Sequence, residues 1–107
     1  MSAGLRVAVA TGRRGATVAV AGELDLATVP KLARAVAHCR SSAAHVTLDL
    51  RELDFIDCSG LRCILEADRQ GPLTVIPGTG RARQLLALTG TDRRLALAGA
   101  PVASRAA

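Results

Sequence analysis

The sequence predicts a small α/β domain with a mixed β-sheet, because segments of strand character alternate with amphipathic helical segments along most of the chain. Two apolar runs, at 5–9 and 17–21, flank a turn that contains two glycines, and this arrangement predicts a β-hairpin. After the hairpin, helices separate the strands, and strands joined through helices lie parallel with right-handed crossovers. We therefore expect one sheet with the hairpin at an edge.

The first helix is predicted from a cap, a proline and an apolar stripe. Asp25 or Thr28 is placed to cap it, and Pro30 lies in its first turn, where a missing N–H costs little. Apolar residues recur at helical spacing from position 29 to position 37, so one face is expected to pack on the sheet. The helix is expected to end near Ser41 and Ser42.

The rest of the chain repeats the pattern of strand and helix. The expected elements are a strand at 46–50, an apolar return to the core at Phe55 and Ile56, a helix that begins at Ser59 or Gly60, a strand at 73–76, a helix at 81–89 and a short strand at 95–97. Gly71 and Pro72 stop the second helix, and Gly90 is placed as the C-cap of the third. No pattern predicts structure from 99 to 107.

Length and composition are those of one ordinary globular domain, so residues 1–107 are expected to form a single unit. The core must be aliphatic, since Phe55 is the only aromatic residue. No apolar run approaches the about 18 residues that span a bilayer, and the first residues lack the pattern of a signal peptide. We expect a cytoplasmic protein without a membrane partner.

Three cysteines, Cys39, Cys58 and Cys63, are an odd number without CxxC spacing, which fits a reducing compartment rather than a disulfide scaffold. Together with His38 and His45 they match none of the zinc-binding patterns. We expect neither a metal site nor a cofactor.

The net charge of +5 raises the alternative of a nucleic-acid binder, but its distribution argues against one. The basic excess lies at the two ends of the chain, whereas residues 23–68 carry eight acids against five bases. The arginines are not gathered in one helix, and a single phenylalanine offers no stacking platform. We expect no direct contact with nucleic acid.

The junction Asp57-Cys58-Ser59-Gly60, between an apolar run and a helix, is the candidate functional site. The first N–H groups of a helix lack intrahelical partners, and the positive end of the dipole favours an anion such as a phosphate on Ser59. Gly60 would allow a partner to come close, and Asp57 would orient the Ser59 hydroxyl or accept its proton. Most serines in such a position only cap the helix, so residue types alone favour a capping role.

A nucleophilic enzyme is a weaker interpretation of the same serine. An activated serine needs a base, but His38 and His45 are expected at the opposite end of the sheet. The chain also lacks GxSxG, P-loop and GxGxxG patterns. We expect no enzymatic activity and no catalytic residue.

Four segments in register give the chain a resemblance to a known family. Gly22-Glu23-Leu24-Asp25, Leu48-Asp49-Leu50, Phe55-Ile56-Asp57-Cys58-Ser59-Gly60-Leu61 and Leu88-Thr89-Gly90 are similar to the STAS domain of bacterial anti-sigma factor antagonists. The resemblance covers about residues 5–97 and implies a small mixed sheet with helices packed on one face.

The resemblance also implies a switch. An unphosphorylated antagonist binds an anti-sigma factor that is a serine kinase, and a sigma factor is thereby released. Phosphorylation by that kinase breaks the complex, and a serine phosphatase restores it. By position in the motif, Ser59 would be the phosphoacceptor, while Asp25, Asp57, Cys58 and Gly60 would shape the partner-binding site.

Two features depart from the family pattern. Cys58 replaces a serine that is common there, and we expect it to be a buried structural residue. Residues 98–107 are too short and too poor in large apolar side chains to form the amphipathic helix with which many members end. The alternative that keeps the fold is a STAS scaffold or transporter-associated binding module in which Ser59 is never phosphorylated.

Overall fold

The computed structural model describes residues 4–99, so the expectations for 100–107 lie outside the described residues. The elements are β1 (Leu5–Gly12), β2 (Gly15–Leu24), α1 (Val29–Arg40), β3 (Val46–Ile56), α2 (Cys58–Gln70), β4 (Leu73–Ile76), α3 (Arg81–Thr89), a short 3-10 turn η1 (Thr91–Arg93) and β5 (Ala96–Leu97). The order of strands and helices is the one that the sequence predicts.

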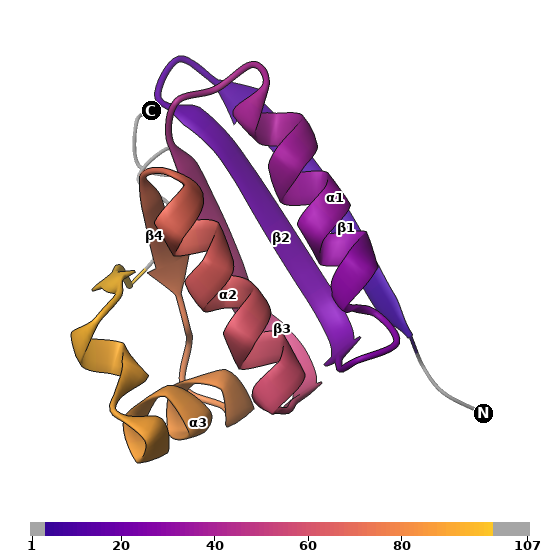
Figure 1. The fold of residues 1–107 in the computed structure, drawn as a ribbon, viewed down its shortest axis with the longest axis vertical. Coiled ribbons are helices and arrows are strands. Elements are labelled where there is room, and N and C mark those ends of the chain that lie inside the picture. The colour runs from indigo at the N-terminus through magenta and orange to yellow at the C-terminus, as the bar shows by residue number, and fades with distance from the viewer. Residues whose placement is uncertain (1–3, 100–107) are drawn as a thin grey trace.

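The strands form one mixed sheet in the order β1-β2-β3-β4-β5 (Figure 1). β1 and β2 pair antiparallel from Leu5 opposite Gly22 to Gly12 opposite Gly15. The three following pairs, β2 with β3, β3 with β4 and β4 with β5, are parallel. The predicted fold class is therefore confirmed, with the hairpin at one edge of the sheet.

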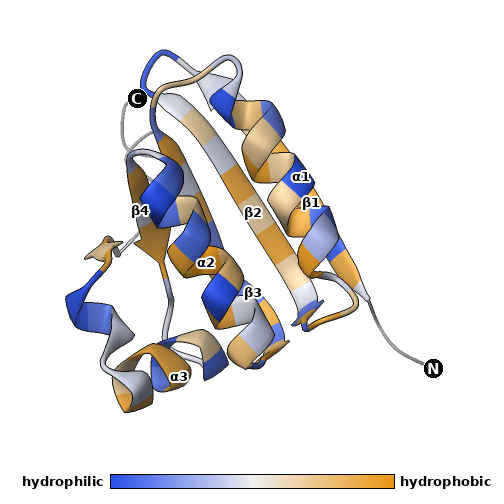
Figure 2. Ribbon diagram, viewed as in Figure 1, coloured by the Kyte–Doolittle hydropathy of each residue, from blue (hydrophilic) through white to orange (hydrophobic). Residues whose placement is uncertain are grey.

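Helices α1 and α2 lie side by side over one face of the sheet, and α3 lies below α2 near the end of β3 (Figure 1). Burial alternates strictly along β2, as expected when one face of a strand meets the core. Val18 and Val20 of β2 and Leu48 and Leu50 of β3 are buried there against the helices, with Ile64 of α2. Figure 2 shows hydrophobic residues along the strands, while hydrophilic residues occupy outward parts of α2.

β3 is longer than the strand expected at 46–50. It extends to Ile56, and its pairing with β2 shifts register twice along this added length. Phe55 is 41% exposed, whereas Ile56 is buried. The expectation that both residues return to the core was wrong for Phe55. Successive side chains of a strand point to opposite faces, so only one residue of the pair meets the helices.

The face of the sheet opposite α1 and α2 carries a buried carboxylate. Asp49 lies between Leu48 and Leu50, so it points away from their face, and it is 8% exposed. Arg51 donates to it from Nε at 3.0 Å and from Nη2 at 2.8 Å. These hydrogen bonds hold the pKa of the Asp49 carboxyl below its ordinary value, against the opposing effect of burial.

Two of the expected helix-end features are found, whereas Thr28, the N-cap of α1, makes no side-chain capping hydrogen bond. Gly90 ends α3 in the left-handed conformation, with φ +75°, as its position after the apolar stripe predicted. Pro30 lies in the first turn of α1. None of the helices in residues 4–99 is long and apolar enough to cross a membrane.

Candidate functional site

The parallel strands β2 and β3 end side by side, which brings two acidic residues to one end of the sheet. Leu24 pairs with Ile56 at the last position of the register. The Asp57 N–H donates to the Leu24 carbonyl oxygen at 3.3 Å. Asp25 and Asp57 follow these strand ends directly, so both lie at the same end of the sheet.

Asp57 is the N-cap of α2. Its backbone is extended, with φ −118° and ψ −171°, and its Oδ1 accepts a hydrogen bond from the Gly60 N–H at 3.1 Å. The helix therefore begins at Cys58, earlier than the expected start at Ser59 or Gly60. Asp57 binds the backbone of the first turn rather than the serine hydroxyl that we expected it to orient, because an unpaired N–H at a helix start needs an acceptor.

Ser59 is the second residue of α2 and is partly exposed. A capping role for Ser59 is wrong, since Asp57 occupies that position. Within residues 4–99, no hydrogen bond engages its hydroxyl. The hydroxyl thus stands at the positive end of a 13-residue helix, whose first turn contains no acidic residue.

Gly60 is buried, and its missing side chain serves packing inside the molecule. A Cβ added there would lie 2.8 Å from Leu24 Cγ and 3.0 Å from Ile56 Cγ1. The first turn of α2 thus rests on the ends of β2 and β3. The expectation that Gly60 leaves room for a partner was wrong, because the space in question faces the core.

The three cysteines differ in their surroundings. Cys58 is exposed, so the expectation of a buried structural residue was wrong. Burial raises the pKa of the Cys39 thiol and of the Cys63 thiol.

Asp25 organises the loop between β2 and α1. Its Oδ1 accepts hydrogen bonds from the N–H groups of Ala27 at 3.0 Å and Thr28 at 3.1 Å. The Thr28 hydroxyl in turn donates to the Glu23 carbonyl oxygen at 2.8 Å. Asp25 therefore orders the loop that follows β2.

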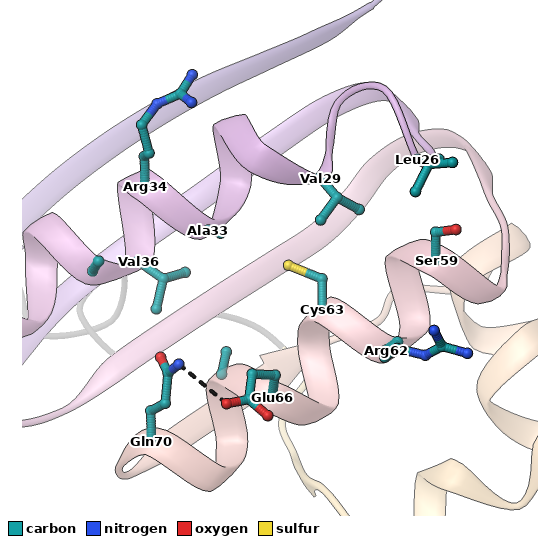
Figure 3. Close-up of a pocket in the computed structure, with 12 residues that line it drawn as sticks. Leu26, Val29, Ala33, Arg34, Val36, Ser59, Arg62, Cys63, Glu66 and Gln70 are labelled. Atoms are coloured by element: carbon teal, nitrogen blue, oxygen red, sulfur yellow. Dashed lines mark hydrogen bonds between the residues drawn. The ribbon is translucent and has the colours of Figure 1, made fainter.

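A groove of about 620 Å³ runs between α1 and α2, and Ser59 lies at one end of it (Figure 3). Leu26, from the loop after β2, stands near Ser59 at the same end, and Gln70 marks the other (Figure 3). Arg34 of α1 and Arg62 of α2 are also among its lining residues. Sequence analysis missed this groove, although the spacing of three residues between Ser59 and Arg62 places both on one side of the helix.

The histidines lie far from Ser59 along the sheet. His45 immediately precedes β3, whereas Ser59 follows the other end of that strand. Its Nε2 lies 2.9 Å from the Thr74 hydroxyl. The expected separation of histidine and serine is confirmed. In the part of the chain from 4 to 99, no three His, Cys, Asp or Glu residues cluster as metal ligands would.

Comparison with known families gives the class of this domain. The family model described as "Mlab, STAS domain" matches residues 7–102. The chain belongs to this STAS family. No curated protein sequence matches it.

Solved structures show the same architecture. An anti-sigma factor antagonist from Mycobacterium paratuberculosis is similar with a TM-score of 0.82 and 26% identity, over 94% of this chain and 92% of that one. SpoIIAA in its unphosphorylated form gives a TM-score of 0.71 and 17% identity, over 87% and 88%. The phosphorylated form of SpoIIAA, a Bacillus cell fate determinant, gives 0.62 and 19%, over 87% and 91%.

Proposed function

We propose that this protein is an anti-sigma factor antagonist whose binding is switched off by phosphorylation of Ser59. The observation that carries the proposal is the placement of Ser59, partly exposed at the start of α2, in a chain that belongs to the STAS family. The similarity to the mycobacterial antagonist extends over 94% of the chain. The protein acts by binding, without enzymatic activity of its own, in the cytoplasm.

In the proposed cycle, the unphosphorylated protein binds an anti-sigma factor that is also a serine kinase. A sigma factor is thereby set free. The kinase then transfers the γ-phosphoryl group of ATP to the Ser59 oxygen, the hydroxyl proton passes to a base of the kinase, and ADP leaves. A serine phosphatase hydrolyses the phosphate ester and returns the protein to its binding form.

The surroundings of Ser59 suit a phosphate that changes binding without unfolding the domain. A phosphoserine carries about −1.5 to −2 charges at pH 7, and a helix N-terminus accommodates that charge. Gly60 packs inward and Asp57 caps the turn, so neither contact involves the Ser59 hydroxyl. The fold is also known for SpoIIAA in both its unphosphorylated and its phosphorylated form.

Intact-mass spectrometry after incubation with ATP and lysate of the source cells tests the proposal. The wild type should gain one phosphate, and Ser59→Ala should gain none. Ser42→Ala is the matched control, because Ser42 is an exposed serine in the loop after α1 and its loss should leave the phosphorylation intact. If the wild type gains no phosphate in a lysate that phosphorylates a known substrate, the switch is contradicted. The protein would then be a STAS binding module that is not regulated at Ser59.

A further inference from the structure

The groove between α1 and α2 exists because small residues face each other across the two helices. Ala33 of α1 is exposed, and Ala67 and Cys63 of α2 lie across from that helix. Larger side chains at these positions would fill the space between the helices. The volume of about 620 Å³ is large enough for several side chains of a bound segment.

The surface inside and around the groove is apolar. Val29 and Val36 contribute from α1, and Leu26 is 76% exposed at the end near Ser59. A large aliphatic side chain left in water beside an open apolar groove is typical of a surface that another chain covers. An amphipathic helix that lays its apolar side into a groove between two helices is a recurring mode of such recognition.

The charges at the groove indicate the chemistry of the occupant. Arg34 and Arg62 are exposed and come from the two opposite helices. Neither has an ion-pair partner within residues 4–99. Glu66, the one acidic residue of the lining, is paired with Arg69 and also accepts from Gln70. The two free guanidinium groups complement carboxylates on the polar side of a bound helix.

We infer that the groove is the docking surface for an acidic amphipathic helix of the partner protein. The inference rests on the proposed function in one respect: the helix belongs to the partner that Ser59 phosphorylation releases. Ser59 lines the end of the groove, and Arg62 follows it by three residues on the same helix. A phosphate on Ser59 therefore pairs with Arg62 and repels the carboxylates of the bound helix, which explains release without a change of fold.

Selection from a display library of random helical peptides against the immobilised full chain tests the inference. Selected peptides should carry apolar residues at helical spacing and a net negative charge, and amide shifts should map to Leu26, Ala33 and Cys63. Arg34→Glu and Arg62→Glu should each weaken binding about tenfold. Arg14→Glu, in the exposed turn of the hairpin, makes the same charge change outside the groove and should leave binding unchanged.

A second arm of the experiment uses protein with phosphoserine installed at position 59 during translation. This form should bind the selected peptides about tenfold more weakly than the unmodified protein. Peptides without acidic bias, peptides that map to another face, or no selection above background would overturn the inference. Neither arm needs the kinase of the cell, so the two hypotheses are tested separately. The groove can prove not to bind acidic helices although Ser59 is phosphorylated in cells, and Ser59 can prove not to be phosphorylated although the groove binds such helices.

Discussion

Asp57 and Gly60 are joined by a hydrogen bond from the Gly60 N–H to Asp57 Oδ1 at 3.1 Å, and the candidate phosphoacceptor Ser59 lies between them. The bond caps α2, while the α-carbon of Gly60 rests on Leu24 and Ile56. The contacts of Asp57 and Gly60 thus hold the backbone of the first turn, and the Ser59 hydroxyl takes no part in them. The stability of the first turn of α2 therefore does not depend on the Ser59 hydroxyl, and a reaction at that hydroxyl leaves the capping contacts intact.

Asp57→Ala should lower the free energy of unfolding by about 1 kcal/mol, because it removes the N-cap of α2. Asp57→Asn keeps a capping oxygen and should remain close to the wild type. Urea denaturation of the two variants measures the difference. Phosphorylation of Asp57→Asn should proceed at nearly the wild-type rate, since the carboxylate binds a backbone N–H. A large loss of rate in the stable Asn variant would instead make Asp57 a participant in the transfer.

Gly60→Ala should destabilise the protein by about 1–3 kcal/mol, as expected when a methyl group is forced into a packed core. The added Cβ would lie 2.8 Å from Leu24 Cγ, and Leu24 is fully buried. Gly12→Ala is the matched control, since a Cβ there would meet nothing within 4 Å. Thermal and urea unfolding of both variants provide the comparison. Equal stabilities would show that the first turn of α2 does not rest on the strand ends as described.

Cys58 should be the first thiol to react with iodoacetamide in the native protein. It is exposed, whereas burial raises the pKa of Cys39 and of Cys63 and keeps these thiols protonated. Mass spectrometry should show one fast modification, absent from Cys58→Ser, and a slower one at Cys63, which is partly exposed in the groove. Cys39, which is buried, should react only after denaturation. Fast modification of Cys39 in the folded protein would contradict the packing of α1 on the sheet.

Stability should depend on pH through Asp49. Hydrogen bonds from Arg51 hold the pKa of the folded-state carboxyl below the unfolded value of about 3.9. The contribution is therefore complete above about pH 5 and is lost as the pH falls through the folded-state pKa. Asp49→Asn should lower the urea midpoint at pH 7, and the difference from the wild type should shrink toward pH 2.

Asp54→Asn is the control for Asp49, because Asp54 is exposed on the same strand and makes no ion pair within residues 4–99. It should leave the pH profile of the wild type nearly unchanged. A loss of stability in Asp49→Asn that is the same at pH 7 and pH 2 would assign the effect to packing rather than to the ionised pair.

The sequence was sufficient for the architecture, because strand and helix periodicity survive packing. The order of elements, the hairpin at the edge and the cap at Gly90 follow from local patterns that the structure keeps. The end of β3 was harder, since an apolar pair does not reveal which of its members faces the core. Phe55 therefore lies outward where the sequence suggested burial.

The sequence predicted the position of the candidate site more accurately than the contacts that its residues make. Four consecutive residues pointed to the junction, but the partner of the Asp57 carboxylate, the inward packing of Gly60 and the exposure of Cys58 depend on a start of α2 that residue types could not fix. The groove was missed for a different reason. The groove lies between α1 and α2, and the sequence of either helix alone does not indicate how closely the two helices pack.

The most direct test of the switch compares the affinity of the kinase that modifies Ser59, once purified, for two forms of this protein. One form is unmodified, and the other carries phosphoserine at position 59 installed during translation. The unmodified form should bind at least about tenfold more tightly, a difference of about 1.4 kcal/mol. Equal affinities would contradict the account, because phosphorylation of Ser59 would then leave the complex intact.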